Sequence, residues 1–299
     1  MSGSIVEPTT ASGPADDSPA AGIRLPDRPL LVIEPSHRWI PLNIQQIWAY
    51  RGLLYFLAWR DLKVRYKQTI LGGAWAVIQP LTTMFVFTIF FGKLAKIPSE
   101  GLPYPIFAYA GLLPWTYFSN AVTKSANSLI SEGRLISKVY FPRILVTMTP
   151  SLAGLVDFSI STAVYFLLMI WFRTPVEWEI VFLPLLAAMT GILAFSIGTL
   201  MSGWNVRYRD LRQVMGFGIQ LMLFASPVIY PTTMIPEKWR WLLMLNPMTG
   251  IIEAFRTVLL PDRPLNVLAL VIGIVMTIVL FLVAVFQFRR VERGLADII

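Results

Sequence analysis

Long apolar blocks, separated by short polar and charged stretches, set the pattern of this chain. The blocks are about 20 residues long, and a helix of that length, rising about 1.5 Å per residue, crosses about 30 Å of hydrocarbon. We therefore predict six membrane-spanning helices, at residues 74–91, 105–122, 144–172, 180–201, 214–230 and 265–288. The third block is longer than a straight span requires, so we expect it to tilt or to extend beyond the hydrocarbon.

Composition indicates the same fold class, an all-α polytopic membrane protein. Of the 299 residues, 56% are hydrophobic and only 14% are charged, which is too little charge to cover the surface of a soluble domain. The net charge of +8 does not indicate nucleic-acid binding. The basic residues lie at the ends of the apolar blocks instead of forming a continuous basic domain, as membrane orientation requires.

The distribution of basic residues also predicts the orientation. Six spans place both termini on one side of the membrane. If that side is the cytoplasm, 18 of the 25 Lys and Arg residues lie inside. The remaining seven are in the outer loops: Lys93, Lys96, Arg173, Lys238, Arg240, Arg256 and Arg263. Because cytoplasmic segments carry the excess of basic residues, we expect both termini in the cytoplasm.

Four regions follow from this pattern. Residues 1–29, rich in Ser, Pro, Ala and Gly, are expected to form a disordered cytoplasmic tail. Residues 30–73 hold an amphipathic helix at 42–67, lying in the membrane interface, and then a short loop. Residues 74–288 form the six-span domain, and residues 289–299 form a second cytoplasmic tail. The interface helix has a capping residue and an apolar face: Asn43, then Ile44, Ile47, Trp48 and Leu54.

Two connecting segments are too regular to be plain loops. The inner one, 124–143, has an apolar side on an otherwise polar segment, formed by Leu129, Ile130, Leu135, Ile136, Tyr140 and Phe141. The outer one, 231–264, predicts two short helices at 237–245 and 248–260, which end at Asn246-Pro247 and at Pro261. In the second, Glu253 and Arg256 are spaced to form an i,i+3 ion pair.

Residue types that carry catalysis are scarce. The single histidine, His37, lies beside the polar tail and is expected to be solvated, and cysteine is absent. The chain has no Gly-x-x-x-x-Gly-Lys-Ser/Thr phosphate loop and no metal-ligand spacing. We therefore expect no catalytic, metal or ATP site in this chain.

Asp157 is the one acidic residue well inside a predicted span. A carboxylate at such a depth is a candidate for ion or proton movement. An ion pair or hydrogen bond between two helices explains it equally well.

Aromatic residues, 13% of the chain, form a stripe in the second span. Phe107, Trp115 and Phe118 share one helical face, with Gly111 between the first two. The stripe is suited to line a conduit for sugar rings. Ordinary packing of aromatic side chains is the commoner explanation of such a pattern.

Six motifs point to one family. They are RDLKVRYKQTILG at 60–72, LISKVYFPR at 135–143, LVDF at 155–158, WNVRYRD at 204–210, LNPM at 245–248 and FRRVERGLAD at 288–297. Their order and spacing resemble the permease subunits of the ABC-2 polysaccharide exporters, which move O-antigen, capsule and teichoic acid. The resemblance runs from Trp39 to the C-terminus and is greatest to the O-antigen permeases of the Wzm type.

The resemblance implies a homodimer of six-span subunits in the bacterial inner membrane. Each subunit would bind a cytoplasmic ABC ATPase that carries the ATP and Mg, and the substrate would be a lipid-linked polysaccharide. The family pattern assigns coupling to the ATPase to Ser131, Glu132, Arg134, Lys138 and Tyr140. It assigns substrate loading at the lipid headgroups to Arg60, Lys63, Lys67, Gln68 and Gly72. It assigns the glycan path to Phe107, Trp115 and Phe118, and outer gate helices to a segment holding Trp239, Trp241, Glu253 and Arg256.

Several alternatives stay open at this point. Arg143 is followed by Ile144 where the family often has an acid, so an ion pair there is in question. Arg60, Lys63 and Lys67 form a basic stripe that suits a phosphate-rich lipid carrier and ordinary anionic lipid equally well. Other functions to weigh are an ion-coupled carrier that relies on Asp157, a membrane glycosyltransferase, and an ABC-2 permease for small lipids or drugs.

Overall fold

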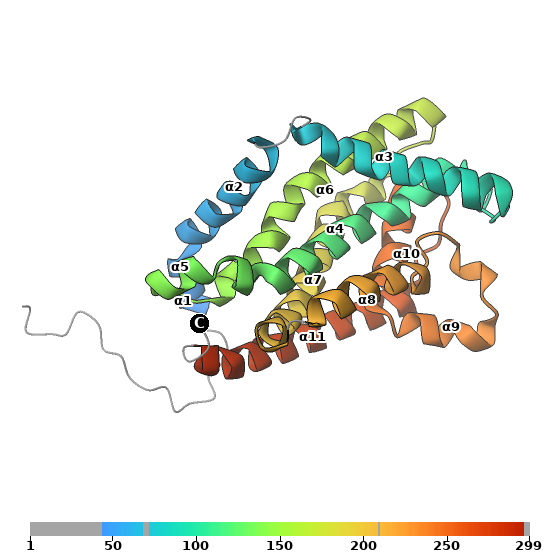
Figure 1. Ribbon diagram of the computed structural model, residues 1–299. Coiled ribbons are helices and arrows are strands. Elements are labelled where there is room, and N and C mark those ends of the chain that lie inside the picture. The colour runs from blue at the N-terminus through green and yellow to red at the C-terminus, as the bar shows by residue number, and fades with distance from the viewer. Residues whose placement is uncertain (1–43, 68–71, 209, 296–299) are drawn as a thin grey trace, which may run out of the picture. The chain divides into compact units, whose positions relative to one another are not determined.

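The computed structural model describes residues 44–67, 72–208 and 210–295. The predicted tail at 1–29, Asn43 and Gln68 lie outside these residues. Every regular element in the described part of the chain is helical (Figure 1), which confirms the all-α fold class.

The helices follow one another with short connections. Before the first membrane-length segment come α1 (Ile44–Ala49), α2 (Arg51–Lys67) and a short 3-10 turn, η1 (Gly72–Ala74). The bundle then contains α3 (Trp75–Phe87), the π-helix η2 (Thr88–Leu94), α4 (Tyr104–Ser131), α5 (Gly133–Lys138), α6 (Ile144–Phe172), η3 (Trp178–Phe182) and α7 (Leu183–Arg207). The last elements are α8 (Leu211–Ala225), η4 (Thr232–Met234), α9 (Glu237–Met244), α10 (Pro247–Leu259) and α11 (Val267–Leu295).

Four of the predicted spans coincide with helical segments long and apolar enough to cross a membrane. They are Trp75–Leu94, Ile144–Phe172, Trp178–Arg207 and Val267–Glu292. The predicted second span lies in α4, which is long but mostly buried by its neighbours, and the fifth lies in α8, which has only 15 residues. Helices α9 and α10, predicted as two short helices, meet at 102° and together form at most one further, bent span.

Helix α4 is the centre of the bundle, and α6 and α7 lie alongside it (Figure 1). Small residues allow α7 to come close. An added Cβ at Gly198 would lie 2.4 Å from the Ser125 side chain, and one at Gly191 would lie 2.4 Å from the Tyr117 hydroxyl. The Tyr117 hydroxyl donates a hydrogen bond to the Ser151 carbonyl of α6, at 2.9 Å. Small residues thus let three apolar helices pack with their backbones close together, as is common in membrane bundles.

The N-terminal helix differs from its prediction. The expected single helix at 42–67 is divided at Tyr50, next to Gly52, a weak helix former in the first turn of α2. Trp48, predicted on the apolar face, is 68% exposed, whereas Leu57 is buried. Ile47 and Leu54 of the predicted apolar face do pack against a buried cluster that includes Leu145 and Phe288, and α2 lies along α6.

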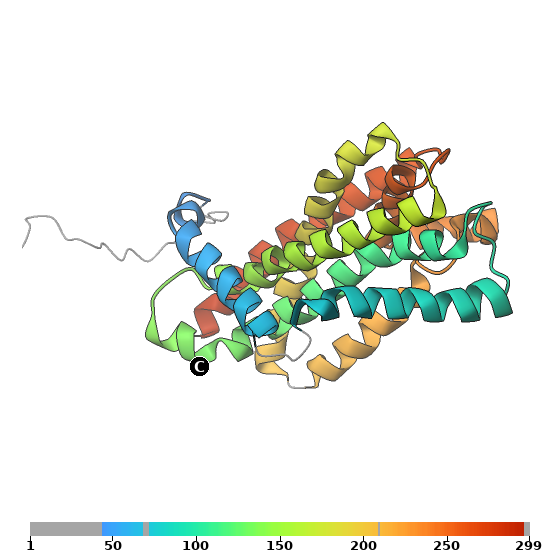
Figure 2. The same ribbon diagram turned by 90° about the horizontal axis from the view of Figure 1, so that it is seen from above.

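Two groups of elements lie at opposite ends of the bundle in both views (Figures 1 and 2). Helices α1, α2 and α5 lie at one end, together with the C-terminal end of α11, and α9 lies at the other. Helix α11 continues to Leu295, so most of the tail predicted at 289–299 is an extension of the last helix. The regions predicted for coupling and for gating are therefore far apart.

Candidate functional site

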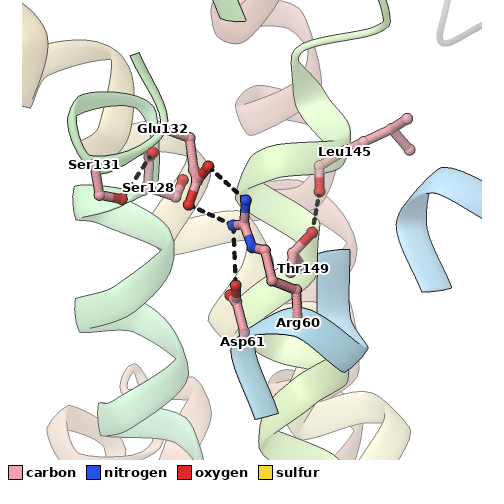
Figure 3. Close-up of polar contacts among 7 residues, drawn as sticks. All are labelled: Arg60, Asp61, Ser128, Ser131, Glu132, Leu145 and Thr149. Carbon is pink, nitrogen blue, oxygen red and sulfur yellow. Dashed lines mark hydrogen bonds and ion pairs between the residues drawn. The ribbon is translucent and has the colours of Figure 1, made fainter. Parts of the chain in front are cut away.

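The turn between α4 and α5 is joined to α2 by an ion pair (Figure 3). Arg60 Nη1 donates to Glu132 Oε2 at 3.0 Å, and Arg60 Nη2 donates to Glu132 Oε1 at 2.5 Å. Arg60 Nη2 also contacts Asp61 Oδ1 at 3.1 Å. Two parallel bonds to one carboxylate fix both distance and orientation, which is the strongest form of arginine–carboxylate contact.

The position of Glu132 follows from the local sequence. Helix α4 ends at Ser131, and Glu132 is the single residue between it and α5, followed by Gly133. The Ser131 hydroxyl donates to the Ser128 carbonyl at 3.1 Å within the last turn of α4 (Figure 3). A carboxylate at this break leaves the helix axis and reaches Arg60, 72 positions earlier in the chain.

The two carboxylates of this cluster, Glu132 and Asp61, both stabilise the charge of Arg60. Partial burial lowers the pKa of the Arg60 guanidinium, but hydrogen bonds and charges from Glu132 and Asp61 raise it by more, and the result is a pKa above the ordinary value. The side chains of Arg60 and Glu132 are 33% and 25% exposed. The pair is thus held firmly yet remains within reach of water.

A cavity of about 240 Å³ lies beside this ion pair, between α2, α4 and α6. Lys124 of α4 lines it, and surrounding protein atoms together with Arg65 lower the pKa of its ammonium group to about 8. Sequence reasoning assigned no role to Lys124. The available signal was a lone lysine two residues beyond the predicted second span.

Asp157 of α6 is paired, not free. Arg65 and Tyr66 of α2 both donate to its carboxylate, and the side chain is 27% exposed. Of the two interpretations that the sequence left open, the described contacts favour a bond between two helices.

The other residues predicted for coupling lie on the outer surface of this end. Arg134, Lys138 and Tyr140 are exposed, Tyr140 by 81%. The predicted apolar side is formed only in part, because Leu129, Ile136 and Phe141 are buried, whereas Ile130 and Tyr140 face outward. Helix α5 and the two residues that follow it therefore present a basic and aromatic surface away from the bundle.

The residues predicted for substrate loading fall into two groups. Lys63 and Lys67 are exposed on α2, with Lys63 Nζ 5.5 Å from the Trp59 ring centre, and Gly72 lies in the short turn before α3. Arg60, predicted as part of the same basic stripe, is engaged by Glu132 and Asp61. The exposed stripe is accordingly reduced to the two lysines.

The aromatic stripe of α4 is buried within the chain. Phe107, Trp115 and Phe118 are 0%, 5% and 1% exposed, and the rings of Trp115 and Phe118 lie 5.6 Å apart. These rings pack against neighbouring helices because α4 is enclosed by them. In this conformation all three side chains are enclosed by the bundle, and a glycan path along them stays a prediction.

At the other end, the predicted i,i+3 pair of α10 is confirmed. Arg256 Nη1 and Glu253 Oε1 lie 3.6 Å apart, and the Arg256 side chain is fully buried. Arg256 also donates to the Val228 carbonyl at 2.8 Å and to the Tyr230 carbonyl at 3.3 Å, over the ring of Phe107 at 3.9 Å. The predicted gate residues Trp239 and Trp241 lie on α9 and are exposed.

A family model described as "ABC-2 type transporter" matches residues 52–260, about two thirds of the chain. The chain belongs to the ABC-2 type transporter family.

Individual relatives are similar to this chain over a longer range than the family model. The "O-antigen export system permease protein RfbA" of Klebsiella pneumoniae is 29% identical over 249 residues, covering 83% of this chain and 95% of that protein. RfbA of Myxococcus xanthus is 29% identical over 259 residues, covering 83% and 96%. The "Polysialic acid transport protein KpsM" of Escherichia coli is 24% identical over 206 residues, covering 68% and 79%.

The ABC-2 region includes both polar clusters. Residues 52–260 hold Arg60 and Glu132 at one end of the bundle and Glu253 and Arg256 at the other. The two ion pairs are therefore features of the transporter domain itself.

Proposed function

We propose that this chain is the membrane-spanning permease subunit of an ATP-driven exporter of lipid-linked polysaccharide. It would move an O-antigen-like glycan from the cytoplasm across the bacterial inner membrane. Relatives named for O-antigen export support this choice, because they cover 83% of the chain, whereas the polysialic acid relative covers 68%. Export of capsule or teichoic acid is the alternative within the same class, ahead of an exporter of small lipids or drugs.

ATP hydrolysis would belong to a partner subunit. The sequence has no phosphate loop of its own, so ATP and Mg would be held by a cytoplasmic ATPase. The exposed surface formed by Arg134 and Lys138 of α5 and by Tyr140 just after it is suited to bind that partner.

The proposed mechanism rests on the ion pair between Arg60 and Glu132. It ties the helix expected to meet the lipid headgroups to the turn expected to meet the ATPase. When the ATPase closes and pushes α5, a two-bond contact would pull α2 along and rock the spans. The glycan would then advance without any covalent chemistry.

The proposed assembly is a homodimer of six-span subunits with cytoplasmic termini. Here α4 and α8 would provide the two spans beyond the four longest apolar segments. Helix α8 supports this view, because exposed apolar side chains recur along it, as lipid or a second copy would require: Val214, Phe217, Leu221 and Phe224.

Removal of the chain tests the function directly. In a strain that lacks it, we expect surface glycan to be lost and lipid-linked glycan to accumulate in the inner leaflet, with both effects reversed by the wild-type chain. Surface glycan that is unchanged after removal would contradict the proposal. A defect in efflux of small amphiphiles with normal surface glycan would favour the small-lipid alternative.

Docking of the ATPase is tested by the double substitution Arg134→Ala/Lys138→Ala. We expect less ATPase to copurify with the permease and less glycan-stimulated hydrolysis. Lys238→Ala is the matched control, since Lys238 is an exposed basic residue on α9, at the opposite end of the bundle. Normal copurification and hydrolysis in the double variant would refute the docking surface.

A further inference from the structure

A second cavity lies away from the Arg60–Glu132 pair, beside α9 and α10. Its volume is about 560 Å³, within the range of ordinary small-molecule sites. Its walls come from the loop before α4, from η4, α9 and α10, and from the loop that leads into α11. None of the sequence patterns assigned a ligand to it.

Hydrogen bonds and an ion pair, to other wall residues and to Glu177, hold the polar groups of the walls in place. Arg263 pairs with Glu100, and the Thr233 hydroxyl donates to Glu100 Oε1 at 3.2 Å. The Asp262 amide donates to Glu177 Oε1 at 3.3 Å, and Asn266 Oδ1 accepts from the Ala269 amide at 3.1 Å. A cavity whose lining is fixed by such bonds is ready to bind without reorganisation.

Two buried polar atoms of the walls make no hydrogen bond within the described residues, although one of them, Glu253 Oε1, lies 3.6 Å from Arg256 Nη1 in an ion pair. The other atom is Arg263 Nη1. Two other wall residues, Glu100 and Asp262, have left-handed backbones with φ of 55° and 56°. A strained backbone of this kind, at residues other than glycine, is found most often at functional sites.

The chemistry of the lining selects the ligand class. Carboxylates from Glu100, Glu253 and Asp262 accept hydrogen bonds from hydroxyls, and the guanidinium groups of Arg240 and Arg263 donate to ring and hydroxyl oxygens. Three acids and two bases nearly cancel, so the site favours neither a phosphate nor a free cation. Aliphatic side chains, Leu102 and Met244 among them, offer apolar surface to C–H groups.

We infer that this cavity is a binding site for one or two residues of a neutral sugar. The choice of sugar over another polyol rests on the proposed function. The site lies within a single chain, at the end of the bundle opposite α5, and is separate from the cavity beside Arg60.

The absence of cysteine from the sequence allows a direct test on the full-length permease with its ATPase. Thr233→Cys places a unique thiol in the cavity wall, and Lys238→Cys places one on an exposed part of α9 outside it. The rate of maleimide labelling is measured with D-mannose, D-galactose, L-rhamnose or N-acetylglucosamine, with glycerol as the polyol control. At a sugar concentration ten times Kd, labelling of Thr233→Cys should slow about tenfold.

A second substitution checks that protection arises from the cavity. Asp262→Asn tolerates the left-handed backbone but removes a charged acceptor, so the sugar concentration that gives half-protection should rise about tenfold. Lys238→Cys should label at the same rate with and without sugar. Protection of neither thiol by any of the four sugars would overturn the inference, as would equal protection of both thiols.

Surface glycan in cells that carry Thr233→Cys separates this inference from the proposed function. Normal surface glycan without sugar protection would refute the cavity site and leave the exporter intact. Sugar protection in a chain whose removal does not alter surface glycan would refute the exporter and leave a sugar-binding membrane protein.

Discussion

Two arginine–glutamate pairs lie toward opposite ends of the bundle and differ in how much water reaches them. Arg60 and Glu132 are 33% and 25% exposed, whereas Arg256 is 0% exposed beside Glu253. Arg60 donates to the carboxylates of Glu132 and Asp61, while Arg256 also donates to two backbone carbonyls and lies over an aromatic ring. The same two residue types thus form a water-accessible link at one end and a buried anchor at the other.

Energetics explain the contrast. A partly exposed ion pair contributes about 0–1 kcal/mol to stability, so losing it should leave the fold intact. Removing one partner of a buried pair costs about 3–5 kcal/mol, because an uncompensated charge is left inside. We expect the first pair to matter for coupling and the second for folding.

The largest effect is expected for Arg256→Met. Glu253 would lose its counter-charge, and the Val228 and Tyr230 carbonyls would lose their donor. The folded state should lose about 3–5 kcal/mol, measured as a lower Tm and a lower yield of purified permease. Arg240→Met is the matched control, since Arg240 is 36% exposed and pairs loosely with Glu237 at 3.8 Å. Equal Tm values for the two variants would contradict the role of Arg256 as an anchor.

The next largest effect on stability is expected where α10 packs against α11. An added Cβ at Gly250 of α10 would lie 2.1 Å from the Ala269 carbonyl of α11, whereas one at Gly218 of α8 meets nothing within 4 Å. Gly250→Ala should destabilise by about 1–3 kcal/mol through overpacking. Gly218→Ala should be neutral or stabilise by up to about 1 kcal/mol, since alanine is the better helix former. Thermal unfolding of both variants in the same detergent makes the comparison, and equal stability would show that α10 is not closely held.

The sequence predicted those features of the two ends that depend on neighbouring residues. Asn246-Pro247, predicted to end the first of the two outer helices, does separate α9 from α10; Asn246 Oδ1 accepts from the Met248 amide, and proline suits the first turn of α10. The Glu253–Arg256 spacing likewise gave the ion pair that the structure contains. Such signals lie within a few positions of one another.

The sequence did not predict contacts between residues that lie far apart along the chain. Glu132 and Arg60 were assigned to different functions, although they bond across 72 positions, and Asp157 finds Arg65 and Tyr66 across more than 90. The stripe on α4 has the spacing expected of a conduit, but burial of that face depends on which helices surround it. Periodicity identifies a face and does not determine what covers it.

A smaller effect is expected for Asp157→Asn. An asparagine oxygen can still accept from Arg65 or Tyr66, so stability should fall by about 1 kcal/mol or less. Export should remain dependent on ATP and indifferent to an imposed pH gradient. Loss of export with the ATPase complex intact, together with export driven by a pH gradient alone, would instead support an ion-coupled carrier.

The smallest effect on stability and the largest on coupling are expected at Arg60 and Glu132. Exchanging their charges tests the central claim most directly, through the rate of glycan-stimulated ATP hydrolysis in the assembled complex. Arg60→Glu and Glu132→Arg should each lower that rate about tenfold, and the double variant should regain most of it, because contacting residues are coupled by about 0.5–3 kcal/mol. Normal rates in both single variants, or a double variant no better than the worse single one, would contradict a mechanical link through this ion pair.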